Sequence, residues 1–283
     1  MCDYSAMSDA SESATAESSH PLPPPAVTTL SLAIEGAVGH IELNRPEKLN
    51  ALSRSALDDL ATAARWFDTA KNVKVVVIRG AGRAFCSGFD LQDRTWAELG
   101  QPERSAATGR AMAEAIVDMK AITVAAIHGH CIGGGVVLAA ACDLRIATVT
   151  AQFRIPEIDL GMPLFWTGIP LLVREIGPAR TKELVLTGRA VSAADADRIG
   201  LVNQVVPDDQ LETTVLGLAA QLAAKPAHVV STTKRQVDAV VAPVPHDDPG
   251  VDSDVAGLAA AFRDSECRES ATAYLERLMT RKS

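Results

Sequence analysis

The chain has 283 residues and a net charge of −8, with 47% hydrophobic and 22% charged residues, which is typical of a soluble globular protein. The negative charge argues against nucleic acid as a partner, and no apolar run reaches the roughly 18 residues that a membrane helix needs. The five cysteines include no CxxC pair. They indicate a reducing compartment and predict a cytoplasmic protein.

The first 26 residues are rich in Ser, Ala and Pro and contain no Lys or Arg. They lack the basic start of a signal peptide and the arginines of a mitochondrial leader. We predict a disordered tail over 1–26 that contributes little to folding, with the folded domain beginning near Val27.

The first predicted elements are a hairpin, a helix and a buried strand. Residues 28–44 form two short apolar runs around a Gly-containing turn, which predicts the hairpin. Apolar residues at helical spacing predict a helix over 53–68, with Ser53 or Ser55 as its N-cap. The β-branched run 74–80 predicts a strand that is buried on both faces.

The next segments repeat the alternation of strand and helix. A helix is expected at about 104–119, before a second buried strand at 122–129. A third strand is expected near 144–148 and a fourth near 152–156. This order predicts an α/β fold with parallel crossover connections.

From about residue 167 the pattern becomes helical. Ser192 and Asp195 are spaced as a capping box, and residues 242–254 form a Pro- and Asp-rich loop. Helices are expected at 167–177, 179–188, 192–200, 208–224, 228–241 and 255–279.

Glycine clusters follow two of the buried strands. AGRAFCSGFDL (81–91) follows the strand at 74–80, and HCIGGGVVL (130–138) follows the strand at 122–129. Glycines that open a helix after a strand point backbone N–H groups into a crevice. Two such crevices could direct two N–H donors at one oxygen, as in an oxyanion hole. Close-packed glycine turns remain the alternative.

Other site motifs are incomplete. The G-x-G run that starts at residue 80 has Phe85 where a dinucleotide-binding loop needs glycine, and the chain has no P-loop. Ser87 lacks the first glycine of a nucleophile elbow. His128, His130 and Cys131 have no second ligand cluster, so no metal site is predicted.

Six segments, in this order, resemble the crotonase superfamily, also called the enoyl-CoA hydratase/isomerase family. The resemblance runs from about Val27 to Met279. It implies a ββα spiral acyl-CoA-binding core over 27–205 and a C-terminal helical trimerisation region over 206–283. It also implies an acyl-CoA thioester substrate, no cofactor besides the coenzyme A of that substrate, and a homotrimer or hexamer. The segments are LNRPEKLNAL (43–52), GAGRAFCSGFDL (80–91), IHGHCIGGGVVLAAACDLRIA (127–147), FRIPEIDLGM (153–162), LTGRAVSAADADRIGLVNQVVP (186–207) and the C-terminal helix.

The resemblance assigns an oxyanion hole. Phe89, after the Ser-Gly pair, and Gly134, the middle glycine of the triplet, match the positions whose N–H groups hold the thioester oxygen. We therefore expect the triplet to lack side chains because a ligand oxygen must approach its backbone closely.

The resemblance also assigns a coenzyme A site. Lys48 matches a cation for the phosphates and Leu49 a backbone contact, although an ordinary surface lysine is the alternative at the first position. Asp90 and Leu91, directly after the oxyanion residue, match the stretch along the pantetheine arm. Gln92 stands where many hydratases carry a lysine.

The family's hydratases use two glutamates, and this chain keeps one. Glu157 is retained, whereas Val137 replaces the glutamate of the G-G-G-x-E pattern. Adding water across a double bond is work that two carboxylates usually share, whereas moving a double bond needs one base. The sequence therefore favours Δ3,Δ2-enoyl-CoA isomerisation.

Two neighbouring residues support the isomerase. Phe165 and Trp166 resemble a Phe-Trp pair of mitochondrial-type enoyl-CoA isomerases and would shape an apolar pocket, unless they pack in the core or a trimer contact. A hydratase with another second base, for which Asp90 and Asp93 are candidates, is the alternative. A catalytically weak binding subunit is a further alternative.

Overall fold

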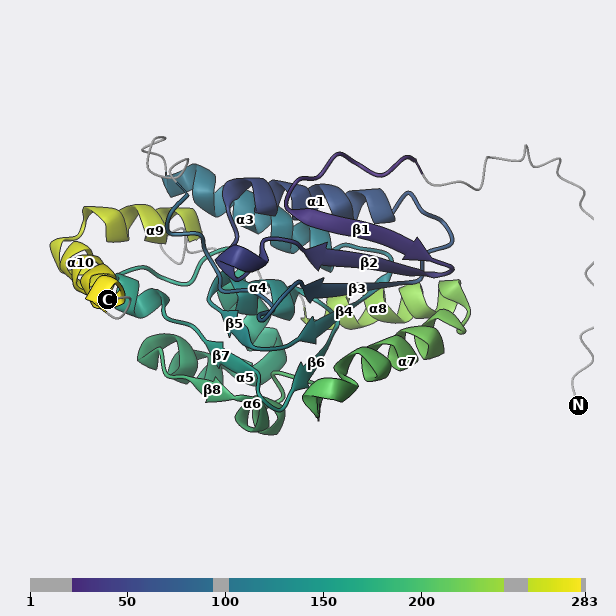
Figure 1. Ribbon diagram of the computed structural model, residues 1–283. Helices are drawn as coiled ribbons and strands as arrows, with labels where there is room; N and C mark the ends of the chain where they lie inside the picture. Colours follow the sequence, from purple (N-terminus) through teal and green to yellow (C-terminus); the bar gives the residue numbers. More distant parts are fainter. Residues whose placement is uncertain (1–21, 94–101, 242–253, 281–283) are drawn as a thin grey trace, which may run out of the picture.

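A six-stranded sheet forms the centre of the computed structural model, which describes residues 22–93, 102–241 and 254–280 (Figure 1). The strand order is β1-β2-β3-β4-β6-β9; β1 and β2 are antiparallel, and the other neighbours are parallel. A smaller sheet has the order β5-β7-β8. The strands are β1 (Leu30–Glu35), β2 (Val38–Leu43), β3 (Val75–Gly80), β4 (Ile122–Ile127), β5 (His130–Ile132), β6 (Leu144–Thr148), β7 (Gln152–Arg154), β8 (Val191–Ser192) and β9 (Gln204–Val206).

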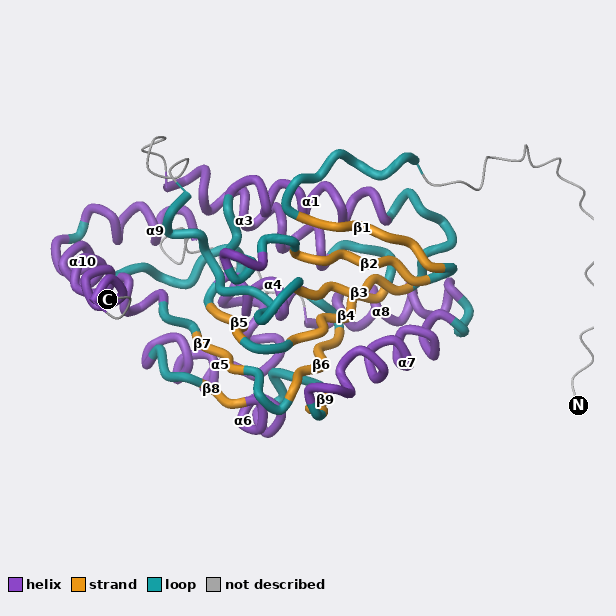
Figure 2. Tube along the Cα trace, in the orientation of Figure 1, coloured by secondary structure: helices purple, strands orange, loops and turns teal. Residues whose placement is uncertain are grey.

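Helices cover both faces of the large sheet (Figures 1 and 2). The pair α1 and α3 lies over one face, α7 packs on the other beside α8, and α9 and α10 lie at one end of the molecule. The helices are α1 (Arg54–Phe67), α3 (Pro102–Val117), α4 (Gly134–Ala141), α5 (Gly168–Thr187), α6 (Ala193–Ile199), α7 (Leu211–Ala223), α8 (Ala227–Val241), α9 (Asp254–Arg263) and α10 (Ser265–Thr280), with 3₁₀ turns η1 (Pro46–Lys48), η2 (Glu157–Leu160) and η3 (Asp208–Gln210).

The apolar side chains of β3 belong to two hydrophobic clusters, one on each face of the sheet. Successive side chains of a strand point to opposite faces of the sheet. Val76 and Ile78 accordingly belong to the cluster that includes the α1 side chains, whereas Val75 and Val77 pack with the α7 side chains. This explains the continuous hydrophobic pattern and confirms the α/β prediction with a mainly parallel sheet.

The predicted caps of two helices are confirmed. The Ser53 hydroxyl accepts the Ala56 N–H at 3.2 Å and begins α1. Ser192 accepts the Asp195 N–H at 3.1 Å and begins α6. A polar side chain at each of these positions satisfies an N–H that the first helical turn cannot.

The prediction of a single terminal helix over 255–279 is wrong. The chain forms α9 and α10, which are separated at Asp264. The Asp264 carboxylate accepts the Cys267 N–H at 3.0 Å and so caps a new helix. The short strand β5 was also missed, because its three residues lie between glycines and resemble a loop.

Two predicted segments fall partly or wholly outside the described residues. Residues 1–21 of the expected tail and 242–253 of the expected Pro/Asp loop are not described. The remainder of the tail contacts the domain, since the Trp66 indole N–H donates to the Leu22 carbonyl at 2.7 Å. Strand β9 crosses the boundary expected between residues 205 and 206.

Candidate active site

The two glycine-containing loops meet at the ends of β3 and β4. The Ile132 N–H donates to the Cys86 carbonyl at 3.0 Å. A Cβ on Gly88 would lie 3.3 Å from the amide nitrogen of Gly134, so the two loops are in direct contact. The structure thus brings together the segments that carry Phe89 and Gly134. As the first residue of α4, Gly134 has an N–H without an acceptor inside the helix.

Each glycine of the triplet 133–135 faces a different protein group. A Cβ on the first would lie 2.4 Å from Oε1 of Glu157, and one on the second 2.2 Å from Cζ3 of Trp166. A Cβ on the third would lie 2.7 Å from the carbonyl oxygen of Cys86. The expected reason for the triplet was the approach of a ligand oxygen. The structure adds that close-packed protein atoms exclude a side chain at all three positions.

Glu157 is buried at the start of η2, with only 6% of its surface exposed. It is therefore no surface glutamate. Burial raises the pKa of its carboxyl to about 7, partly opposed by a hydrogen bond to its own backbone. Its Oε2 makes no hydrogen bond to any of the described residues. A carboxyl group in this state can both take up and release a proton near neutral pH.

The turn that carries Glu157 is held by the C-terminal helix. Helix α10 packs against η2. At the end of η2, Gly161 has a φ of +64°, and a Cβ there would lie 2.1 Å from the Cys267 carbonyl oxygen. The left-handed backbone and the close approach of α10 together require glycine.

A small, mainly apolar cavity lies beside the Glu157 carboxyl. Its volume is ≈ 10 Å³, which is room for about one water molecule. Val137, the residue predicted to stand in place of a second glutamate, lines it and is fully buried. Glu157 is the only ionisable side chain among the described residues that line the cavity. These are Phe89, Gly134, Val137, Glu157, Leu164, Phe165 and Trp166.

Three aromatic rings line the cavity and contact one another. The ring centroids of Phe165 and Trp166 are 5.2 Å apart, nearly perpendicular to each other. The Phe89 ring lies 6.5 Å from the first and 6.2 Å from the second. Edge-to-face contacts of this kind hold aromatic clusters together. The predicted apolar pocket residues and the predicted oxyanion residue are thus neighbours.

The two aspartates considered as second bases have other partners. Asp90 is buried, and its Oδ2 accepts from the Arg45 guanidinium at 2.8 Å. Asp93 Oδ2 accepts the Arg54 N–H at 2.9 Å, at the start of α1. Neither lines the cavity with Glu157. Sequence reasoning missed Arg45, which anchors the segment that follows Phe89.

The expected coenzyme A residues lie on and beside η1. Lys48 is exposed, and its Nζ donates to Gln92 Oε1 at 2.8 Å. Leu49 has a left-handed backbone with φ of 52°, and Leu91 is exposed. Sequence reasoning missed Asn50, whose side chain donates to the Ala81 and Ala84 carbonyls at 2.9 and 2.8 Å and ties η1 to the first glycine loop. Its left-handed φ of 55° is one that asparagine tolerates.

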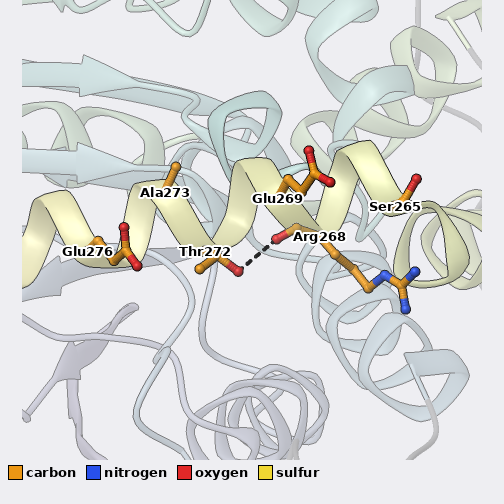
Figure 3. A pocket seen from close by; sticks show the side chains of 6 residues that line it. All are labelled: Ser265, Arg268, Glu269, Thr272, Ala273 and Glu276. Atoms are coloured by element: carbon orange, nitrogen blue, oxygen red, sulfur yellow. Dashed lines mark hydrogen bonds between the residues drawn. The ribbon is translucent and has the colours of Figure 1, made fainter.

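A second hollow lies along α10 and has a different character (Figure 3). Its charged side chains belong to one helix, and Figure 3 shows Arg268 and Glu269 pointing to different sides of it. Thr272 Oγ1 donates to the Arg268 carbonyl at 2.9 Å, a bond within the helix. The polar groups of this hollow do not converge on one point, so the cavity at Glu157 is the candidate active site.

The described residues contain neither a candidate membrane span nor a candidate metal-binding cluster. No helix in 22–93, 102–241 or 254–280 is long and apolar enough to cross a membrane. Within the same ranges, no group of three or more His, Cys, Asp or Glu residues is arranged to hold a metal ion.

Comparison with known sequences shows relatives over most of the chain. The family model described as enoyl-CoA hydratase/isomerase matches residues 33–281. A probable enoyl-CoA hydratase of Mycobacterium bovis is 36% identical over 213 residues, which cover 74% of this chain and 81% of that protein. A mevalonyl-coenzyme A hydratase of Aspergillus fumigatus is 37% identical over 185 residues, covering 64% of this chain and 67% of that protein.

Solved structures share the fold. An enoyl-CoA hydratase from Mycobacterium avium subsp. paratuberculosis has a TM-score of 0.78 and 28% identity, covering 88% of this chain and 99% of that one. A monofunctional enoyl-CoA isomerase from M. smegmatis has a TM-score of 0.65 and 32% identity, covering 77% and 95%.

Proposed function

Because the chain belongs to the enoyl-CoA hydratase/isomerase family and has its crotonase-like fold, we propose that it is a Δ3,Δ2-enoyl-CoA isomerase that uses Glu157 as its single proton carrier. The observation that carries this proposal is the lining of the cavity. Glu157 is the only ionisable side chain among the described lining residues, and the buried Val137 stands where a second carboxylate would be needed.

The proposed reaction moves one proton and one double bond. The N–H groups of Phe89 and Gly134 hold the thioester oxygen, so that negative charge can develop on it. The Glu157 carboxylate removes a proton from C2, and the electrons form a dienolate. The same carboxyl then returns a proton to C4, which leaves the double bond between C2 and C3. A pKa of about 7 suits both steps, since the carboxylate and the acid are both accessible near neutral pH.

The apolar surroundings of Glu157 favour proton return over water addition. Phe165, Trp166 and Val137 provide no carboxylate or other base that could deprotonate a water molecule for attack on C3. A cavity with room for about one water also limits the exchange of the transferred proton with solvent.

Hydration of 2-enoyl-CoA is the second candidate, because several relatives are named as hydratases. In this reaction Glu157 would have to deprotonate the water and protonate C2 without the help of a second carboxylate. For that reason we expect hydration to be slower than isomerisation.

The test is the unaltered protein, assayed with 3-butenoyl-CoA and 2-butenoyl-CoA under the same conditions. Isomerisation is expected to exceed hydration at least tenfold in kcat/KM. Hydration faster than isomerisation by tenfold would overturn the single-carboxylate reasoning. Turnover of neither substrate, with retained acyl-CoA binding, would support the third alternative, a catalytically weak binding subunit.

Coenzyme A recognition and assembly complete the proposal. Exposed Lys48 can approach the phosphates by exchanging its hydrogen bond with Gln92, and Leu49 follows it directly at the end of η1 with a left-handed backbone. Phe262, Leu275 and Met279 expose apolar surface on α9 and α10, which supports a subunit contact at this end. A homotrimer or hexamer is the proposed assembly, to be measured by light scattering.

A further inference from the structure

The indole of Trp166 fills a notch between two helices. A Cβ on Gly109 of α3 would lie 2.0 Å from its Cδ1 and Nε1 atoms. A Cβ on Gly134 of α4 would lie 2.2 Å from its Cζ3 atom. The five-membered ring therefore rests on one glycine and the six-membered ring on another, 25 residues apart in the chain. Only glycine at both positions lets the ring lie this close to the two helices.

The backbone around Trp166 is arranged for this placement. Trp166 and Thr167 both have left-handed backbones, with φ of 63° and 62°. Two consecutive non-glycine residues rarely adopt this conformation, and they keep it only where the packing determines it. The indole itself is 2% exposed. The position of Trp166 is thus fixed both by its backbone conformation and by the packing of its side chain.

Phe89 is the least buried of the three rings that line the cavity. It is only half-buried, whereas Phe165 and Trp166 are buried. A cavity of ≈ 10 Å³ is too small even for a four-carbon acyl group, so a bound substrate must displace side chains. Movement of the half-buried Phe89 ring can admit a short group. A long group would have to expel the indole from its notch between α3 and α4.

We propose that Trp166, seated against Gly109 and Gly134, closes the far end of the acyl compartment and restricts the enzyme to short acyl groups. This rests on the proposed function, because it assumes that the acyl chain enters the cavity beside Glu157. Gly109 is the second determinant: a larger residue there would force the indole out of the notch. Trp166 acts on specificity and takes no part in the proton transfer.

The experiment measures binding, so that it does not depend on turnover. Saturated butanoyl-CoA and decanoyl-CoA are titrated calorimetrically into the unaltered protein, Trp166→Leu and Trp166→Ala. The unaltered protein is expected to bind butanoyl-CoA at least tenfold more tightly than decanoyl-CoA. Both variants should shift this ratio at least tenfold towards decanoyl-CoA, since each methylene that enters an apolar site contributes about fourfold in affinity.

The matched control is Trp66→Leu. Trp66 is also a buried indole, but it lies on α1 against Phe67, with ring centroids 4.6 Å apart, and does not line the cavity. Its removal should leave the ratio of the two affinities unchanged. Thermal melting of each variant reports whether it is folded. If the variants do not fold, the ratio of the two affinities in the unaltered protein still tests the proposal.

Several results would overturn the proposal. Decanoyl-CoA binding as tightly as butanoyl-CoA to the unaltered protein would show that the indole does not close the compartment. An unchanged ratio in folded Trp166→Leu, or an equal shift in Trp66→Leu, would remove the assignment to Trp166. Absence of binding at either chain length would instead refute the proposed acyl-CoA function itself.

Discussion

Replacing Glu157 by glutamine should make the protein more stable and nearly inactive. Burial holds the pKa of this carboxyl at about 7 in the folded chain, against an ordinary value of 4.5. The unfolded chain releases the proton more readily, so the ionised carboxylate favours unfolding above pH 4.5. The unfolding free energy of the natural protein therefore falls as pH rises from about 4.5 to 7 because of this group, and the loss then levels off.

The size of the effect follows from the two pKa values. A difference from 4.5 to about 7 corresponds to about 3 kcal/mol at high pH. Glutamine has nearly the same shape and does not ionise. The stability advantage of Glu157→Gln over the natural protein should therefore grow by about 2 to 3 kcal/mol between pH 5 and pH 8. Taking the difference between the two proteins cancels the other titrating groups.

Catalysis should change in the opposite direction. Removal of a placed acid–base group typically costs ~10²–10⁴-fold in rate, and kcat/KM of the natural protein should rise with pH through about 7, as the carboxylate forms. Urea unfolding at pH 5 and pH 8, with isomerase assays over the same range, provides both measurements. Glu269, an exposed glutamate of α10, provides the control variant Glu269→Gln, which should show neither effect.

Two outcomes would refute this reasoning. A stability difference that is the same at both pH values would mean that burial does not hold the Glu157 carboxyl protonated. Activity of Glu157→Gln within threefold of the natural protein would assign the proton transfer to another group.

Three further changes have defined outcomes. Gly133→Ala should lower the unfolding free energy by at least about 2 kcal/mol and reduce kcat, because φ is +51° and the new Cβ would lie 2.4 Å from Glu157 Oε1. A normal melting temperature and a normal kcat would contradict this contact. Val137→Glu places a second carboxyl group in the apolar cavity, so it should add measurable hydration of 2-butenoyl-CoA and lower the unfolding free energy by about 1–3 kcal/mol. A more stable variant without hydratase activity would count against the two-carboxylate argument. Lys48→Ala should raise KM several-fold with kcat nearly unchanged and weaken the salt dependence of KM, and an unchanged KM would remove Lys48 from the coenzyme A site.

The sequence was sufficient to predict the features that depend on short segments. The valine run of β3 and the caps at Ser53 and Ser192 were read from their immediate neighbours and are confirmed. The six matching segments indicated the family, which the comparisons confirm, and they singled out Glu157 and Val137. Such features are predictable because side-chain periodicity and capping act over a few residues.

Long-range contacts determined the rest. No local pattern indicates that Gly109 and Gly134 would enclose Trp166, or that each glycine of 133–135 would face a different protein group. The helix break at Asp264 was missed because the same apolar pattern continues on both sides of it.

The sequence by itself determined that the chain has one family glutamate and a valine in place of the other. Only the tertiary structure decided that this glutamate is buried and that burial raises its pKa to about 7. It also decided that Asp90 and Asp93 are hydrogen-bonded to Arg45 and Arg54 and lie outside the cavity. The physical reason is that a carboxyl group's proton affinity depends on how much water surrounds it. That quantity is set when segments far apart along the chain, which carry Phe89, Val137 and Trp166, pack around one carboxyl group.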